Sequence, residues 1–259
     1  VKVDTTLPTV SVAITGEDGI QNSFLNAGDN VSVTATFSET VNVSGNPTLT
    51  LVVGSDNRTA TYASGSGSTP LVFQYTIQAE ETDTNGISIE ANTLALNSGT
   101  IRDAAGNNAT ITYSSVSANT SYKVDNTAPS VDNFTLSDTA LKAGDTATVT
   151  LRFSEAVVSF SSAADITADN GTLAAMSSAD NITWTGTFTP TANTEDASNT
   201  LSLATRYTDT AGNAGPSATT VNYEVETLAP TVSSFTLSDT ALKASDNATV
   251  SLVFSEAVA

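Results

Sequence analysis

The chain has 259 residues, and its composition excludes several kinds of chemistry. The sequence contains neither cysteine nor histidine, which rules out disulfides, thiolate nucleophiles, Ser-His-Asp triads and zinc sites that use those side chains. The net charge is −19, so nucleic acid and anionic membrane surfaces are disfavoured as partners because both are negatively charged. Cations suit such a chain, although acidity also serves simply to keep a long secreted protein soluble.

The balance of apolar and polar residues indicates a folded chain of short strands. Hydrophobic residues make up 39% of the sequence, which is enough for packed cores. No apolar stretch approaches the roughly 20 residues that span a membrane, so membrane insertion is not expected. Charged residues are only 14%, and Thr, Ser and Asn supply the remaining polarity. This mixture favours many short strands joined by tight turns.

A repeat of domain size organises the chain. Its landmarks are an Asp-x-Thr-Ala-Pro-like entry at 3–8, 124–129 and 225–230, a Phe-Ser-Glu segment at 37–39, 153–155 and 254–256, and an Asp-x-Ala-Gly-Asn turn at 103–107 and 209–213. Their spacing of roughly 100 to 120 residues is too long for a solenoid repeat. We therefore predict domain 1 at residues 1–124, domain 2 at 125–225, and the truncated start of domain 3 at 226–259.

Within each repeat, apolar and polar residues alternate with the period of a half-buried strand. In chain order, the predicted apolar faces are Val31, Val33, Ala35 and Phe37, then Leu49, Leu51 and Val53, then Leu71, Phe73, Tyr75 and Ile77, and in the second repeat Ala147, Val149, Leu151 and Phe153, followed by Ile182, Trp184, Gly186 and Phe188. About seven strands in roughly 100 residues predict an all-β fold of tandem immunoglobulin-like β-sandwich domains.

Trp184 is the only tryptophan, and it allows two interpretations. An exposed indole would offer a stacking platform for a sugar, whereas its alternation with Ile182 and Phe188 favours a place in the core.

The entry motif, the Phe-Ser-Glu-Ala-Val strand end and the Asp-x-Ala-Gly-Asn turn resemble the bacterial Ig-like (Big) domain repeats of large biofilm-associated and RTX-type surface adhesins. The resemblance covers the whole chain. It implies an extracellular spacer, often stiffened by calcium, that holds a ligand-binding tip away from the cell, and it implies no catalytic residue. Glu226 and Ser245 depart from the Asp and Gly of the earlier units, which puts the chemistry of that junction in doubt.

Acidic landmarks are expected to meet at one pole of each sandwich. In a seven-strand sandwich, the linker, the end of the second strand and the last hairpin turn lie at the same end, and calcium takes six to eight oxygen ligands. We therefore predict structural calcium ligands at Asp125, Glu155 and Asp209, with Asp83 reaching in from the loop of the preceding domain, and a weaker second site at Asp4, Glu39 and Asp103. The alternative is that Asp-x-Ala-Gly-Asn is only a turn, since Asp and Asn bond their own backbone and Gly supplies positive φ.

The leading functional hypothesis is a non-enzymatic extracellular stalk or extender segment of a large bacterial surface adhesin, with calcium-stiffened junctions. The alternatives are a carbohydrate- or surface-binding adhesive module, or an accessory Ig-like module of a secreted hydrolase. The expected partners are the neighbouring Ig-like domains of the same chain and Ca²⁺, and the expected state is a monomer at the cell surface or secreted.

Overall fold

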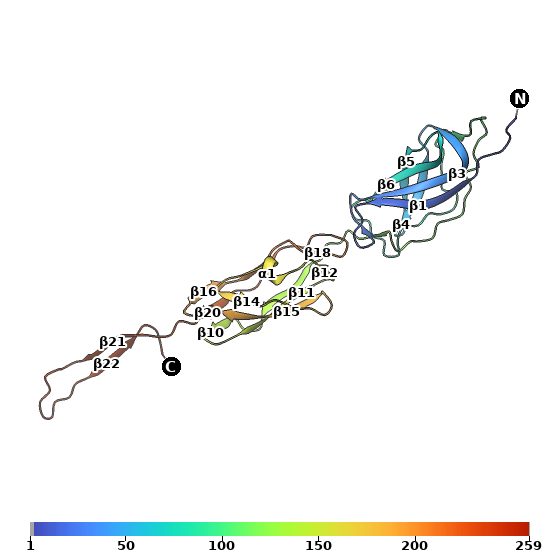
Figure 1. Cartoon of the computed structure of the whole chain (residues 1–259). Coiled ribbons are helices and arrows are strands. Elements are labelled where there is room, and N and C mark those ends of the chain that lie inside the picture. The colour runs from blue at the N-terminus through green and yellow to red at the C-terminus, as the bar shows by residue number, and fades with distance from the viewer. Residues whose placement is uncertain (1–2, 259) are drawn as a thin grey trace. The chain divides into compact units, whose positions relative to one another are not determined.

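The computed structural model of the protein describes residues 3–258, and its regular structure is almost entirely β-strand (Figure 1). Strand makes up 49% and helix 2%, so the predicted all-β fold with tandem Ig-like sandwiches is confirmed. Helix α1 (Ser162–Asp165) has four residues. Across residues 3–258, no helix has the length and apolar character needed to cross a bilayer.

The chain divides into two compact units. Unit 1 contains the chain up to Ser130 together with Glu155–Ser159 and Arg206–Gly215, and unit 2 contains Val131–Ser154, Phe160–Thr205 and the chain from Pro216 onward. Two short segments of the second repeat therefore belong to the unit that the first repeat builds. This grouping follows contacts between residues, so the repeat boundaries at 124 and 225 stay a prediction.

Unit 1 is built around one antiparallel sheet with the strand order β1-β3-β6-β5-β4. Its strands are β1 (Val10–Asp18), β3 (Asn30–Ser44), β6 (Ser68–Thr76), β5 (Asp56–Ser64) and β4 (Thr48–Val53), and β7 (Thr100–Arg102) pairs with the far end of β3. Four short strands complete the unit as two pairs. β2 (Phe24–Leu25) pairs in parallel with β8 (Lys123–Val124), and β12 (Val157–Val158) pairs in antiparallel with β18 (Thr208–Asp209).

The core of unit 1 confirms the period-two alternation. On β3, Val31, Val33, Ala35 and Phe37 are at most 3% exposed, while their sequence neighbours face outward. Val33 lies opposite Phe73 of β6, so two buried faces of neighbouring strands pack side by side. β-branched and aromatic residues at such positions fit a pleated, half-buried surface, which is why this segment becomes a strand.

Unit 2 splits its strands among several smaller sheets. The largest has the order β14-β15-β11-β9, from β14 (Gly171–Leu173), β15 (Thr183–Pro190), β11 (Ala147–Phe153) and β9 (Val131–Leu136). The others join β10 (Ala140–Lys142), β20 (Tyr223–Glu226) and β16 (Glu195–Asn199), then β13 (Ile166–Ala168), β17 (Leu201–Leu203) and β19 (Ala218–Thr219), and finally the hairpin of β21 (Val232–Leu237) and β22 (Val250–Phe254).

The β21–β22 hairpin leaves its apolar side chains in solvent. Phe235 is 72% exposed, and Leu237, Val250 and Leu252 are each about half exposed. Two strands alone cannot enclose a core, which is the physical reason for this exposure.

Trp184 is half-buried rather than fully enclosed. It lies opposite Leu151 on β11, and its indole meets the ring of Phe160 edge to face with centroids 4.8 Å apart. Its neighbour on the same face, Phe188, is completely buried. The prediction that Trp184 lies on the inward face of its strand is thus correct, but its side chain is less buried than predicted. Trp184 lies near the beginning of β15, towards the end of that face.

Replacing Trp184 with Ala should lower the free energy of unfolding by about 2 to 4 kcal/mol, somewhat less than for a fully enclosed tryptophan. The loss comes from the aromatic contact with Phe160 and from the apolar surface that the indole covers. Urea unfolding followed by circular dichroism measures it. A change below about 1 kcal/mol would mean that the indole contributes little to packing.

Candidate metal sites

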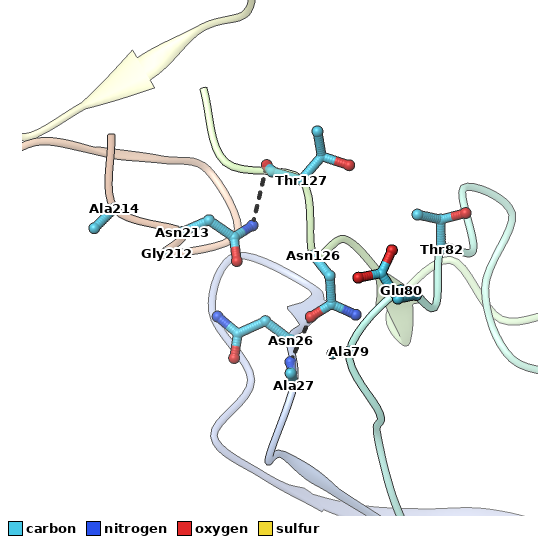
Figure 2. Close-up of a pocket in the computed structure, with 10 residues that line it drawn as sticks. All are labelled: Asn26, Ala27, Ala79, Glu80, Thr82, Asn126, Thr127, Gly212, Asn213 and Ala214. Atoms are coloured by element: carbon cyan, nitrogen blue, oxygen red, sulfur yellow. Dashed lines mark hydrogen bonds between the residues drawn. The ribbon is translucent and has the colours of Figure 1, made fainter. Parts of the chain in front are cut away.

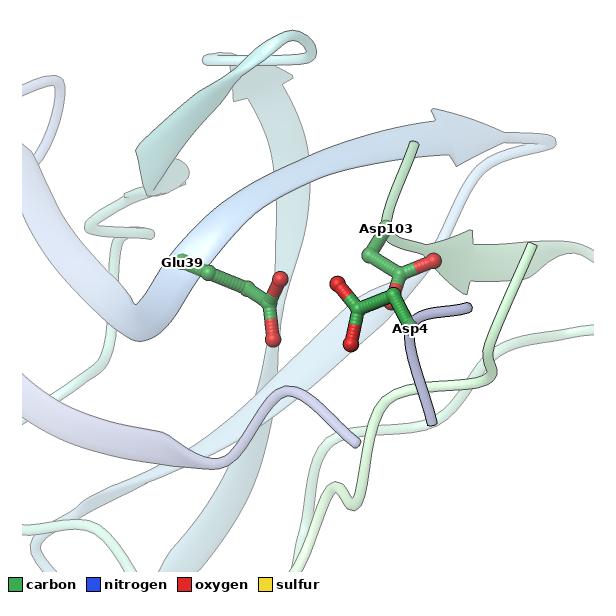
Figure 3. Close-up of side chains that lie close together, drawn as sticks. All are labelled: Asp4, Glu39 and Asp103. Carbon is green, nitrogen blue, oxygen red and sulfur yellow. The ribbon is translucent and has the colours of Figure 1, made fainter. Parts of the chain in front are cut away.

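Asp4, Glu39 and Asp103 gather in unit 1 from three separate segments. Asp4 lies in the segment before β1, Glu39 within β3, and Asp103 directly after β7. One carboxylate oxygen from each lies within 4.8 Å of the others, and Figure 3 shows the three side chains converging. Exposure falls from Asp4, which is exposed, through Glu39 to the buried Asp103.

Asp125, Glu155 and Asp209 form the corresponding cluster one repeat later. Asp125 follows β8, Glu155 follows β11, and Asp209 ends β18. Their carboxylate oxygens also lie within 4.8 Å of one another, and Asp209 is buried. All three belong to unit 1.

A change of strand partner explains why the same residues meet twice. In β3 the pairing with β6 shifts after Thr36, and the strand continues beyond Glu39 as the partner of β7, where Asn42 faces Arg102. In the second repeat the strand breaks around Glu155, and the following β12 pairs with β18 so that Val157 faces Asp209. In both cases the new pairing brings the Glu at the break beside the Asp at the start of the turn.

The structure thus brings six of the seven predicted ligand residues into two clusters, and it places Asp83 elsewhere. Both oxygens of the Asp83 carboxylate accept backbone hydrogen bonds, from Gly54 at 2.8 Å and from Gly86 at 2.7 Å. Asp83 therefore joins its own loop to the turn between β4 and β5 and is not a member of either cluster. The expectation that it reaches the Asp125 cluster needs this correction, because its carboxylate is already committed locally.

Asn107 and Asn213 are the site residues that the sequence reasoning treated only as parts of a turn. Asn213 binds both oxygens of Asp209, through its backbone N–H at 2.9 Å and its side-chain Nδ2 at 2.8 Å, and Nδ2 also donates to the backbone oxygen of Asp125 at 3.0 Å. Asn107 repeats this with Asp103 at 2.8 and 2.7 Å and with the Asp4 oxygen at 3.2 Å. The signal was available, since Asn closes the motif in both repeats.

The glycine of each motif is required by the backbone. Gly106 and Gly212 adopt φ values of 94° and 95°, a region that side chains with a Cβ rarely enter. The motif is therefore a turn and also a support for the cluster, so the two interpretations of Asp-x-Ala-Gly-Asn are compatible.

Electrostatics within the clusters oppose three bare charges. Burial raises the pKa of Glu155, and the nearby charges of Asp209 and Asp125 raise it further. The pKa of Glu39 rises for the same reasons, with Asp103 and Asp4 as its neighbours. Burial alone would raise the pKa of Asp103, but hydrogen bonds from Asn107 and from the turn amides outweigh it and lower that pKa. The turn at residues 103–107 therefore favours the ionised form of Asp103, whereas the neighbouring negative charges disfavour the ionised form of Glu39.

The donor set fits a hard cation. Every candidate ligand is a carboxylate oxygen, and the sequence has no histidine or cysteine to favour zinc or copper. Oxygens on opposite sides of calcium stand roughly 4.6 to 5.2 Å apart, given Ca–O distances of about 2.3 to 2.6 Å. Three oxygens within 4.8 Å of one another can therefore share one ion of this size.

A polar pocket of about 470 Å³ lies beside the Asp209 turn (Figure 2). Its lining consists of Asn26, Ala27, Ala79, Glu80, Thr82, Asn126, Thr127, Gly212, Asn213 and Ala214. None of these ten residues is aromatic, so the pocket offers no stacking platform for a sugar ring.

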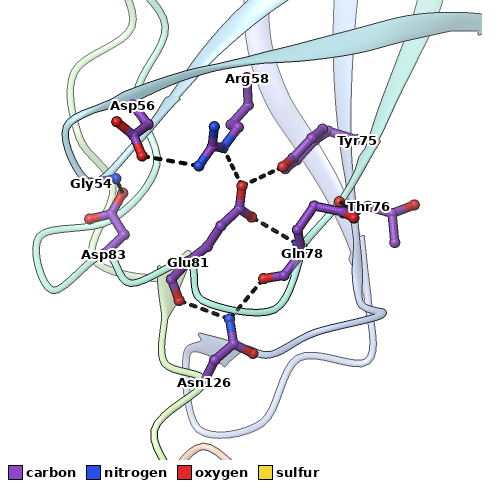
Figure 4. A network of polar contacts seen from close by, with 9 residues as sticks. All are labelled: Gly54, Asp56, Arg58, Tyr75, Thr76, Gln78, Glu81, Asp83 and Asn126. Atoms are coloured by element: carbon purple, nitrogen blue, oxygen red, sulfur yellow. Dashed lines mark hydrogen bonds and ion pairs between the residues drawn. The ribbon is translucent and has the colours of Figure 1, made fainter.

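A buried carboxylate organises the loop above this pocket (Figure 4). Glu81 is 4% exposed, and its side chain binds Arg58, the hydroxyl of Tyr75 and the backbone N–H of Gln78 at 2.9 Å. Arg58 also reaches Asp56 at 3.0 Å near the surface. The charge of Glu81 is thereby paired and hydrogen-bonded, as a buried ion requires.

Comparison with known proteins identifies part of the chain. Residues 125–225 match the family model of the bacterial Ig-like domain. No curated protein matches the chain. Among solved structures, FdeC, an Escherichia coli adhesin, is similar at 11% identity and a TM-score of 0.30, over 99% of this chain and 75% of that one.

A second similar structure is SGBP-B from a mixed-linkage glucan utilization locus of Bacteroides ovatus, in complex with a mixed-linkage heptasaccharide. It shows 16% identity and a TM-score of 0.21, over 87% of this chain and 50% of that one. This chain therefore spans half of the second structure. Both TM-scores are too low to carry an argument about fold or function.

Removing the charge of Glu81 should destabilise unit 1. Glu81→Ala leaves Arg58 and Tyr75 without their shared acceptor and should cost about 3 kcal/mol of unfolding free energy. Asp56→Ala is the matched control, because it removes the exposed partner of the same arginine and should cost less than about 1 kcal/mol. Urea unfolding of both variants compares them, and equal losses would contradict the assigned role of Glu81.

Neutralising Glu155 should stabilise the protein in metal-free buffer at pH 7. The raised pKa means that folded Glu155 binds a proton more readily than unfolded Glu155, so this group's stability contribution is lost as pH rises above about 4.5 through the folded pKa. Glu155→Gln carries no charge and escapes that loss. Melting temperatures between pH 4 and pH 8 test this, with the exposed Glu90→Gln as control for net charge. A variant that melts below the wild type at pH 7 would refute the repulsion.

Proposed function

We propose that the chain is a non-enzymatic extender segment of a bacterial surface protein, in which calcium at the two acidic clusters stiffens the entry to each repeat. The observation that carries the proposal is the recurrence of one arrangement: a linker Asp, a Glu where the strand pairing changes and a turn Asp converge in both repeats. The family match at residues 125–225 supports a bacterial Ig-like repeat as the context.

The mechanism is mechanical and follows from where the ligands come from. Asp125 belongs to the linker, Glu155 to the break between β11 and β12, and Asp209 to the turn that begins at the end of β18. A bound calcium ion supplies the positive charge that neutralises their repulsion. Once neutralised, the three segments are held at one point, and the linker loses its freedom to swing against the second repeat.

The carboxylate geometry favours a cation site over hydrolysis. Glycosidases place two carboxyl groups on either side of a cleft, about 5 to 9.5 Å apart, with the sugar between them. Here three carboxylate oxygens converge within 4.8 Å, which leaves room for one ion. We therefore assign no catalytic role to the clusters.

An extracellular setting suits this function. Calcium modules outside cells bind with Kd values of about 0.1 to 1 mM, so the sites would fill only where calcium is abundant. The proposed partners are calcium and the neighbouring Ig-like domains of the same chain, and the protein would act as a monomer. A sugar-binding role gains no support from Trp184, whose indole packs edge to face against Phe160.

Calcium titration tests the proposal directly. At a concentration a hundred times above Kd, binding should add roughly 2.7 kcal/mol to stability, seen as a rise in melting temperature. Small-angle scattering should show a less flexible chain when calcium is added, because the linker is then held. Asp209→Asn should abolish most of the response of the Asp125 cluster.

Glu90→Gln serves as the control for the loss of one negative charge, because Glu90 is exposed and lies in neither cluster. It should keep the full calcium response. If the wild type shows no rise in melting temperature at 10 mM calcium, or if Asp209→Asn responds like the wild type, the calcium function is wrong and the motif acts only as a turn.

A further inference from the structure

The residue after each linker acid makes side-chain hydrogen bonds back to the sandwich that precedes it. In the first linker, Asn126 donates from Nδ2 to the backbone oxygens of Gln78 at 3.1 Å and Glu81 at 2.8 Å (Figure 4). Its Oδ1 accepts from the backbone N–H of Ala27 at 2.5 Å (Figure 2). One carboxamide therefore joins the linker to two different loops of unit 1.

The loop that receives Asn126 is fixed by its own contacts. The Glu81 side chain is bound by Arg58, Tyr75 and the Gln78 amide, as described above. The backbone oxygens that accept from Asn126 belong to these same two loop residues, Gln78 and Glu81. The sandwich thus holds these acceptor oxygens in place, so binding the linker does not require this loop to lose further conformational entropy.

The next linker repeats the arrangement with different chemistry. Thr227 follows Glu226 as Asn126 follows Asp125, and its hydroxyl donates to the backbone oxygen of Thr191 at 2.6 Å. The hydroxyl oxygen of Thr227 accepts from the backbone N–H of Thr194 at 2.9 Å, and Thr227 is only 8% exposed. The two receiving loops correspond in the fold. Gln78 follows β6, which pairs with β3, and Thr191 follows β15, which pairs with β11, the equivalent strand of the second repeat.

We infer that Asn126 and Thr227 are plugs, side chains that lock each linker onto the sandwich before it without any cation. Backbone bonds accompany each plug, from Asp125 N–H to the Leu25 oxygen at 3.0 Å and from Thr227 N–H to the Thr194 oxygen at 2.8 Å. The plug therefore fixes where the linker leaves its sandwich, and Asp125 is presented from a settled position. This inference does not depend on the calcium function, since every contact in it lies between protein groups.

Amide hydrogen exchange of the full chain in metal-free buffer tests the plugs. The informative amides are those of residues 125 and 227, because their hydrogen-bond acceptors are backbone oxygens that the substitutions leave in place. Asn126→Ala should accelerate exchange at residue 125 at least about fivefold, and Thr227→Val should do so at residue 227, the change expected for losing one hydrogen bond of typical strength. Thr227→Ser keeps the hydroxyl and should stay within about twofold of the wild type.

Two controls separate a local plug from a general loss of stability. Amides of β3 and β11 should keep their protection in every variant, since these strands form the cores of the two units. Asn126→Asp keeps an acceptor for the Ala27 N–H and removes the donors, so it gives a second variant with a milder change. Unchanged exchange at residue 125 in both Asn126 variants, or at residue 227 in Thr227→Val, would overturn the inference. Equal acceleration of the β3 or β11 amides would overturn it as well, because the effect would then be global.

Discussion

The exchange of strand partner at the Phe-Ser-Glu segment is the constraint on which the rest of the arrangement depends. A strand that stayed with one partner would continue along the main sheet and carry its Glu away from the last hairpin. Instead, the pairing of β3 with β6 shifts register between Thr36 and Val41, and the end of β3 then pairs with β7. The chain after β11 pairs with β18 through β12. This change of pairing brings the Glu carboxylate close to the turn Asp in both repeats, so strand pairing and the assembly of the cluster share one cause.

Bringing three carboxylates together is electrostatically unfavourable. Hydrogen bonds offset this repulsion for the turn Asp but not for the Glu. Each turn Asp accepts hydrogen bonds from the backbone and side chain of an Asn, and in the first cluster these bonds lower the pKa of Asp103. The Glu residues have no such support in the pKa pattern, and burial and their acidic neighbours raise their pKa. Each cluster is therefore ordered before a cation arrives, yet it remains unfavourable as a set of three bare charges. This combination of fixed geometry and unrelieved charge supports the proposal that a cation binds there.

The linkers are anchored by a different principle. Asn126 and Thr227 use neutral hydrogen bonds to backbone oxygens, which salt and cation concentration affect little. The linker at residues 125 and 126 thus takes part in two kinds of contact. Asn126 makes neutral hydrogen bonds that need no ion, whereas Asp125 belongs to an acidic cluster whose repulsion depends on pH and on salt. In a chain without disulfides, such short-range polar contacts and the strand cores carry the stability.

The sequence by itself determined the all-β class, the buried faces of the strands and the six acidic residues that converge. The reason is that the alternation of apolar residues and the recurrence of the motifs can both be read directly from the order of the residues. Once this segment became a strand, its alternate residues Val31, Val33, Ala35 and Phe37 had to face inward. The turns required Gly106 and Gly212. Only the tertiary structure decided that the Asp83 carboxylate accepts hydrogen bonds from Gly54 and Gly86, that Trp184 is half-buried and that segments 155–159 and 206–215 join unit 1. The roles of Asn107, Asn213, Asn126 and Thr227 also appeared only there. Each of these depends on which backbone oxygen or amide lies within hydrogen-bond reach, and residues 20 to 100 positions away in the chain set that distance rather than any local pattern.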